Sequence, residues 1–156
     1  MNAGPHRAPP ERGAPELRLQ PSREMKIELL PEQEGFLSGK DAIRQVIQEN
    51  PDTVLAYDIF AGDAPVGFAL LRRFEPGGYF LWDYAVDRRW QGRGLGARAL
   101  RALIDRMIRD HGLKQMTTTY IWGNGAAKRL YERVGFAETE VVDEPGVHEV
   151  NMLYRP

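Results

Sequence analysis

The segment from Arg88 to Ala97 constrains the fold of this chain more than any other stretch. It reads RRWQGRGLGA, with Gly92, Gly94 and Gly96 at every second position. The residues before it favour a strand, and those after it carry the apolar repeat of an amphipathic helix. Glycines at such a junction let backbone N–H groups approach an anion, and the partial positive charge of the helix N-terminus strengthens binding. The segment therefore predicts a strand–helix turn that binds a diphosphate.

The glycine spacing differs from that of both standard nucleotide-binding motifs. Dinucleotide-binding domains use G-x-G-x-x-G, followed by an acidic residue about twenty positions later. This chain has G-x-G-x-G, and its next predicted strand carries Thr117, Thr118 and Thr119. The P-loop lysine is missing as well. Both standard nucleotide interpretations therefore fail.

Composition excludes several classes of partner. The 156 residues include 21 Lys+Arg and 22 Asp+Glu, a balance that argues against nucleic-acid binding. No apolar run approaches the roughly 18 residues that cross a bilayer, so we expect no membrane partner. Cysteine is absent, which removes disulfides, thiolate metal sites and a cysteine nucleophile, and favours a cytoplasmic setting. His148 lacks neighbours at ligand spacing, so we expect no metal site.

The hydrophobic pattern predicts one α/β domain over residues 17–156, preceded by a disordered tail over residues 1–16 that holds four of the eleven prolines. We expect strands over residues 17–20, 54–60, 66–72, 79–86, 113–121, 136–142 and 147–154. We expect helices over residues 23–30, 41–49, from 92 to a C-terminal cap at 112, and over 126–134.

Two motifs carry a resemblance to the GCN5-related N-acetyltransferases. Gln91, Gly94 and Gly96 fill the family's Gln/Arg-x-x-Gly-x-Gly/Ala signature. A second block is similar to the family's Asn-x-x-Ala-x-x-Leu-Tyr-x-x-x-Gly-Phe segment, and it comprises Asn124, Ala127, Leu130, Tyr131, Gly135 and Phe136. Residues 31–36, 81–83 and 142–146 resemble segments of the bacterial spermine/spermidine (diamine) acetyltransferases within that superfamily. The resemblance spans roughly residues 17–154.

The resemblance implies a mixed, mostly antiparallel sheet with helices on both faces and a V-shaped splay between two central strands. It also implies that acetyl-CoA binds in the splay as a co-substrate. Arg89, Arg93 or Arg129 could meet its phosphates. The implied cofactor-binding residues are Tyr84, Ala85, Val86, Gln91, Gly92, Arg93, Gly94, Leu95, Gly96, Ala97, Asn124 and Ala127.

The resemblance further implies direct acetyl transfer to a primary amine. The narrower resemblance to the spermine/spermidine (diamine) acetyltransferases favours a small diamine or polyamine as the acceptor. Tyr131 occupies the family's general-acid position, and the Val86 N–H is the implied oxyanion donor. We expect Asp83 to capture the amine or to relay its proton, and Glu34 to contribute to substrate binding. A homodimer is implied by family habit alone.

Other interpretations of the same residues remain open. Tyr131 on an apolar helix face suits a core residue, Asn124 suits a helix N-cap, and Asp83 suits a salt-bridged strand residue. The acceptor could instead be an antibiotic, an amino acid or a protein amine. A non-catalytic acyl-CoA sensor is a second class of function, although such a binder has no need of a proton donor. A dinucleotide-binding module is a third.

Overall fold

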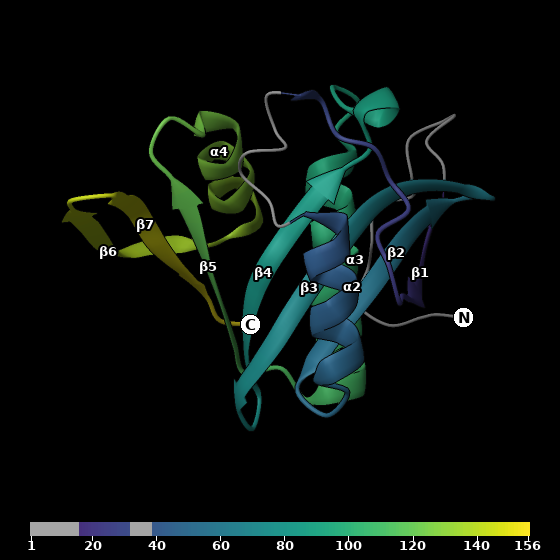
Figure 1. Cartoon of the computed structure of the whole chain (residues 1–156), viewed down its shortest axis with the longest axis horizontal. Coiled ribbons are helices and arrows are strands. Elements are labelled where there is room, and N and C mark those ends of the chain that lie inside the picture. Colours follow the sequence, from purple (N-terminus) through teal and green to yellow (C-terminus); the bar gives the residue numbers. More distant parts are fainter. Residues whose placement is uncertain (1–15, 32–38) are drawn as a thin grey trace.

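Seven strands form one open sheet with helices on both of its faces (Figure 1). The structure is a computed structural model that describes residues 16–31 and 39–156. The strands lie in the order β1-β2-β3-β4-β5-β7-β6, and every neighbouring pair is antiparallel except β4–β5, which is parallel. The strands are β1 (Leu17–Pro21), β2 (Val54–Ala61), β3 (Ala64–Glu75), β4 (Gly78–Val86), β5 (Gln115–Ile121), β6 (Ala137–Glu144) and β7 (Val147–Tyr154). This architecture confirms the mixed, mostly antiparallel α/β fold expected from the sequence.

Three helices and one short 3-10 turn complete the described part of the chain: α2 (Lys40–Glu49), η1 (Arg88–Trp90), α3 (Leu95–His111) and α4 (Gly125–Val134). In Figure 1, α2 lies in front of the sheet and α3 lies behind it. Within the same residues, no helix is both long enough and apolar enough to cross a bilayer. The helices therefore make the two outer layers of a three-layer α/β domain.

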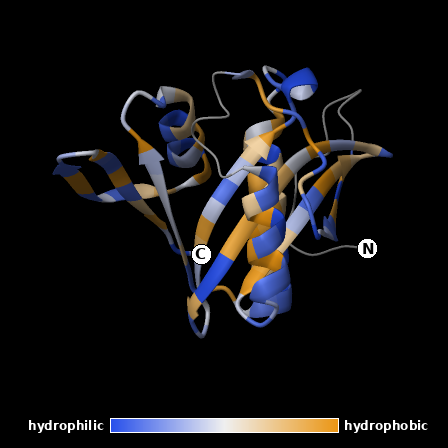
Figure 2. Cartoon of the chain, viewed as in Figure 1, coloured by the Kyte–Doolittle hydropathy of each residue, from blue (hydrophilic) through white to orange (hydrophobic). Residues whose placement is uncertain are grey.

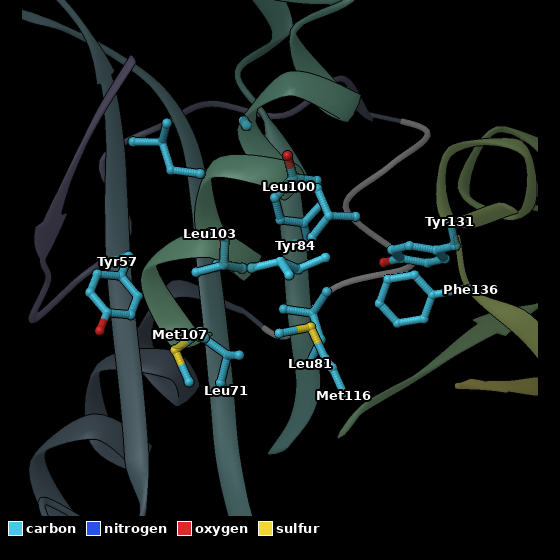
Figure 3. Close-up of a cluster of buried hydrophobic side chains, with 14 of the residues drawn as sticks. Tyr57, Leu71, Leu81, Tyr84, Leu100, Leu103, Met107, Met116, Tyr131 and Phe136 are labelled. Carbon is cyan, nitrogen blue, oxygen red and sulfur yellow. The ribbon is translucent and has the colours of Figure 1, made fainter. Parts of the chain in front are cut away.

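The sheet separates two hydrophobic clusters. The larger one packs against α3 and α4 and includes Tyr84, Leu100, Met116 and Tyr131 (Figure 3). The smaller one packs against α2 through Ile43 and includes Met25, Ile27, Val54, Ala56, Phe68 and Leu70. Figure 2 shows the apolar stretches concentrated in the central strands, whereas β6 and β7 alternate between hydrophobic and hydrophilic residues. The core thus holds β2, β3 and β4 rigid on both faces.

The predicted helix over residues 23–30 is wrong. This segment runs without regular secondary structure, with Met25 and Ile27 buried and Lys26 and Glu28 exposed between them. The side-chain hydroxyl of Ser22, directly before this segment, accepts from the Glu24 N–H at 3.2 Å and also donates to the Glu24 carbonyl at 2.7 Å. The period-two burial pattern is typical of extended backbone, and it lets the segment close the smaller cluster. The predicted tail lies outside the described residues, apart from Glu16.

Strands β4 and β5 pair over only part of their length. Their parallel register runs from Gly78 beside Gln115 to Leu81 beside Thr118 and stops there. We call the Leu81–Thr118 position the fork; at the fork the Thr118 hydroxyl donates to the Leu81 carbonyl at 3.0 Å. Beyond it, residues 82–86 and 119–121, all of them described, form no ladder with one another, whereas β5 stays paired with β7 along its other edge from Met116 to Ile121. The expected V-shaped splay is therefore present.

A β-bulge in β4 lies directly beyond the fork. On β3, Leu70 is opposite Asp83 and Leu71 is opposite Leu81, so Trp82 is an extra residue without a partner of its own. A bulge of this kind bends the strand and re-aims its side chains. Here it shifts the alternation of β4, so that Leu81 packs in the larger cluster while Asp83 lies on the face that carries Leu70 and the smaller cluster.

Candidate active site

A cavity of about 730 Å³ lies between the separated ends of β4 and β5. Its walls come from the far half of β4, the glycine-rich turn, the start of α3, the end of β5 and α4. Among the residues predicted to bind a cofactor, those that line it are Tyr84, Ala85, Val86, Gln91, Gly92, Gly94, Leu95, Gly96, Ala97, Asn124 and Ala127. Tyr131 lines it as well, whereas Arg93 and Asp83 are not among the lining residues. The fold thus gathers most of the predicted site into one hollow.

The glycine-rich turn adopts a backbone that requires glycine at two positions. Gly92 and Gly94 have φ of 76° and 73°, in the left-handed region that strains any other residue. Gly94 forms the N-terminal cap of α3, which begins at Leu95 rather than at Gly92 as the pattern suggested. The Tyr84 hydroxyl donates to the Gly96 carbonyl at 2.6 Å and ties the first turn of α3 to β4. The N–H groups of this first turn have no partner inside the helix. The turn lines the cavity, so these groups are suited to bind a phosphate there.

The start of α4 contributes a second helix N-terminus to the same cavity. Asn124 caps this helix, and its side-chain oxygen accepts from the Ala127 N–H at 3.1 Å. The N-cap interpretation of Asn124 is thus confirmed as its structural role, and Asn124 also lines the cavity. Arg129 lines it too, and its guanidinium lies over the helix start, where a Cβ added to Gly125 would be 3.0 Å from Nη1. Both helix ends and one arginine therefore supply positive potential to the hollow.

The remaining polar residues of the turn mainly hold its shape. The Gln91 side-chain amide donates to the Val86 carbonyl at 3.0 Å and closes the turn onto the end of β4. The Arg93 guanidinium lies 4.9 Å from the centre of the Trp90 ring. Arg89 forms an ion pair with the buried Asp87 at 2.9 Å. Of the three arginines that the sequence could not rank, only Arg129 is in the cavity wall.

Tyr131 reaches from α4 toward the fork. Its ring packs against Phe136, with centroids 5.4 Å apart, and its side chain enters the core cluster from the α4 side (Figure 3). Burial raises the pKa of Tyr131 to about 12; the negative charge of Asp83 acts in the same direction, and hydrogen bonding with Thr118 opposes it. The phenol therefore keeps its proton at any physiological pH and is able to donate it at the fork.

Asp83 is buried at 4% exposure, two residues beyond the fork. Its charge acts on Tyr131, so the two groups belong to one electrostatic environment although they come from β4 and α4. The bulge at Trp82 places this carboxylate on the α2 face, away from the turn that suits a phosphate. The structure thus puts a phosphate-accepting helix start and a buried carboxylate at different ends of the splay.

Sequence reasoning missed Asp87, the buried carboxylate that anchors the whole turn. Its oxygens accept from the backbone N–H groups of Glu28 and Arg89, each at 2.9 Å, and from the Arg89 guanidinium. Burial alone would raise the pKa of this carboxyl, but the hydrogen bonds from Arg89 and Glu28 outweigh it and lower the pKa to about 2. An Asp directly after a strand and before a turn was the available signal, since such residues cap the next helical turn.

Replacing Asp87 with asparagine is expected to destabilise the fold by roughly 2 kcal/mol at pH 7. The pKa of the folded-state carboxyl lies below that of an ordinary aspartate, so the carboxylate stabilises the protein above about pH 4 and this contribution is lost as the pH falls toward 2. Urea unfolding at pH 7 and at pH 2.5 measures both effects. The deficit of the variant should shrink at the lower pH; an equal deficit at both pH values would contradict the assigned ionic role.

Two expectations about ligands concern other parts of the chain. Glu34, proposed for substrate binding, lies outside the described residues. Within residues 16–31 and 39–156, no group of three or more His, Cys, Asp or Glu side chains is placed to hold a metal ion.

The splayed sheet, the glycine-rich helix start and the buried phenol define the class of α/β fold that binds acyl-CoA for acyl transfer. Residues 22–136 match the acetyltransferase (GNAT) family, and the chain belongs to this family.

Curated proteins similar in sequence to this chain include acetyltransferases named for different amine substrates. The chain is 37% identical over 107 residues to the L-2,4-diaminobutyric acid acetyltransferase of Streptomyces avermitilis, a match that covers 61% of this chain and 60% of the relative. It is 34% identical over 84 residues to the spermine/spermidine N(1)-acetyltransferase of Bacillus subtilis, covering 49% and 55% of the two chains. These matches span less than two thirds of the relatives' own length.

Solved structures support the fold. The aminoglycoside acetyltransferase AAC(6')-Ib in complex with coenzyme A superposes with a TM-score of 0.69 at 18% identity, over 90% of this chain and 95% of that one. A GNAT acetyltransferase from Elizabethkingia anophelis with acetyl-CoA bound gives a TM-score of 0.63 at 15% identity, over 90% and 98%. Both are structures of CoA-bound proteins with the same architecture.

Replacing Gly94 with alanine is expected to weaken CoA binding about tenfold, the equivalent of one lost hydrogen bond to a phosphate. Its φ of 73° strains an alanine, and relief of that strain moves the first N–H groups of α3. Gly62 is the matched control, since it has φ of 62° and equally open surroundings but lies in the β2–β3 turn. Calorimetric titration should show normal CoA affinity for Gly62→Ala; equal weakening in both variants would assign the effect to stability alone.

Proposed function

We propose that this chain transfers the acetyl group of acetyl-CoA directly to a primary amine of a small diamine or polyamine. The observation that carries the proposal is the single cavity that joins the glycine-rich start of α3 to Tyr131 between the splayed strands. A pure CoA-binding module would need the first feature but not the second. The family membership and the amine substrates named for the relatives support the same activity.

Acetyl-CoA fits the cavity in one direction. Its pyrophosphate suits the N–H groups at the start of α3, in the turn that includes Gly92 to Ala97. Its amide-rich pantetheine arm suits the edge of β4 that β5 leaves without a ladder, at Tyr84, Ala85 and Val86. Arg129 and the start of α4 suit the remaining phosphate charge. The thioester then points toward the fork and Tyr131.

The chemistry uses the groups at the fork. Asp83 holds the acceptor ammonium, whose pKa is near 10 in water, and this group then loses a proton to solvent or to a carboxylate. The amine nitrogen then attacks the thioester carbonyl to form a C–N bond, the Val86 N–H stabilises the oxyanion, and the positively charged nitrogen of this intermediate releases its extra proton to water. As the C–S bond breaks, the thiolate takes a proton from the Tyr131 hydroxyl, and the amide and CoA leave. Solvent restores the Tyr131 proton.

Thiol release from acetyl-CoA, followed with a colorimetric reagent, tests the function. The acceptors are putrescine, spermidine, spermine, L-2,4-diaminobutyrate, lysine, an aminoglycoside and a lysine peptide, and mass spectrometry identifies the acetylated product. We expect fast release with the small diamines or polyamines. Release only with the aminoglycoside or the peptide would keep the mechanism and reject the acceptor class. Acetyl-CoA binding without release for any acceptor would favour the sensor interpretation.

A further inference from the structure

An arginine and a tryptophan lie together beside Asp83, on the side of the splay away from the glycine-rich turn. The Arg72 guanidinium is 5.5 Å from the centre of the Trp82 ring. Trp82 is 38% exposed and lines the cavity, although large apolar side chains are otherwise mostly buried in the central strands. We infer that the acceptor carries a carboxylate next to its amines, and that Arg72, held on the indole of Trp82, binds this carboxylate. This inference rests on the proposed function.

The strand register places Arg72 on the same face as Asp83. Arg72 is opposite Val54 on β2, and Val54 belongs to the smaller cluster under α2. Asp83 is opposite Leu70, a member of the same cluster two residues away along β3. With about 4.8 Å between strands and about 3.3 Å per residue, the backbones of Arg72 and Asp83 are about 8 Å apart. Both residues therefore lie on the same face of the sheet close to the bulge, with Asp83 buried and Arg72 exposed.

The bulge itself is what brings Trp82 to this face. As the extra residue of β4, Trp82 is not tied to the alternation of the strand, and its ring stacks on a β3 side chain of the α2 face. A planar guanidinium stacked on an indole still presents its N–H edge outward, and the parallel N–H donors along this edge match the two oxygens of a carboxylate. No ion pair between Arg72 and another described residue occupies that edge.

The two charges predict a substrate with two opposite charges. The buried carboxylate of Asp83 suits an ammonium group, and the guanidinium of Arg72 suits a carboxylate a few bonds away. A polyamine has no group for Arg72 and would be repelled by it. An α,ω-diamino acid supplies both groups at once, with one amine free for acetylation. The pair of charges therefore selects diamino acids from the wider class of diamines.

The test compares a diamino acid with the diamine that differs from it only in the carboxylate. L-2,4-diaminobutyrate and 1,3-diaminopropane form such a pair, and kcat/KM is measured for each at saturating acetyl-CoA. The variants are Arg72→Gln, which removes the charge, and Arg72→Lys, which keeps it. Arg73→Gln is the matched control, because Arg73 is the neighbouring exposed arginine and lies opposite Tyr79, on the other face of the sheet. Melting temperature and CoA affinity confirm that each variant is folded.

The wild-type protein should prefer the diamino acid at least tenfold, the effect of one charge-assisted hydrogen-bonded pair. Arg72→Gln should remove about tenfold of that preference by raising KM for the diamino acid, Arg72→Lys should restore part of it, and Arg73→Gln should retain it. Preference for 1,3-diaminopropane in the wild type, or an equal effect of Arg72→Gln on both acceptors, would overturn this inference while the acetyltransferase function stands. Bound acetyl-CoA with no transfer to either acceptor would overturn both.

Discussion

Replacing Tyr131 with phenylalanine is expected to lower kcat about 100-fold, the lower end of what a positioned proton donor contributes. The ring would still pack against Phe136, so the core and the cavity wall are preserved. Only the hydroxyl at the fork is lost, and the CoA thiolate must then leave without a proton. The Kd for acetyl-CoA should stay within about twofold, since the hydroxyl is assigned to the transition state and not to the bound ground state.

The pH dependence separates a proton donor from a packing residue. With a pKa of about 12, Tyr131 stays protonated through the accessible pH range. Deprotonation of Tyr131 should therefore cause no decrease in wild-type kcat below about pH 11. Tyr57→Phe is the matched control, because Tyr57 is also a buried tyrosine of the larger cluster but bonds His111 at 3.2 Å, far along the sheet from the cavity. Unchanged kcat in Tyr131→Phe from pH 6 to 10 would assign Tyr131 to packing alone.

The parts of the site that were predictable from the sequence are those encoded by local spacing. Gly92 and Gly94 occupy positions where the backbone needs φ above zero, and glycine is the residue that meets this need. Asn124 and Tyr131 lie on one helix at fixed separation, so their register follows from the helix period. Local rules therefore sufficed to predict a turn before each of the two helices, although α3 begins at Leu95 and not at Gly92.

The parts that were missed depend on partners far away in the chain. Residues 23–30 are extended because the Glu28 N–H finds the Asp87 carboxylate, 59 positions later, and Met25 and Ile27 fill space under α2. A helix preference of a few tenths of a kcal/mol per residue cannot compete with such contacts. The bulge at Trp82 is likewise a property of the β3–β4 pairing, and the sequence of β4 alone does not predict it. Tertiary context thus determined the α2 side of the splay, where local patterns were least informative.

Replacing Asp83 with asparagine is expected to lower kcat/KM for the amine about 30- to 100-fold, the cost of losing a charged hydrogen-bonding partner for an ammonium. Asparagine keeps the shape of the side chain, so the bulge and the cavity should persist. Because the proposed pyrophosphate site lies at the other end of the splay, the Kd for acetyl-CoA should not change. Steady-state kinetics with the best acceptor, together with a CoA titration, measures both quantities.

The control for Asp83 is the other buried aspartate of the same face. Asp58 is fully buried and pairs with Lys26 at 2.6 Å, so Asp58→Asn also removes a buried charge but one that lies two strands away from the splay. Asp58→Asn should reduce stability and leave the acceptor kcat/KM near the wild-type value, whereas equal kinetic losses in both variants would point to a general loss of packing.

Asp83→Asn should also change the titration of Tyr131, because the Asp83 charge helps to raise the pKa of Tyr131. In the variant the Tyr131 phenol should ionise at lower pH in an alkaline ultraviolet titration, and an unshifted titration would show that the two groups do not act on each other across the splay.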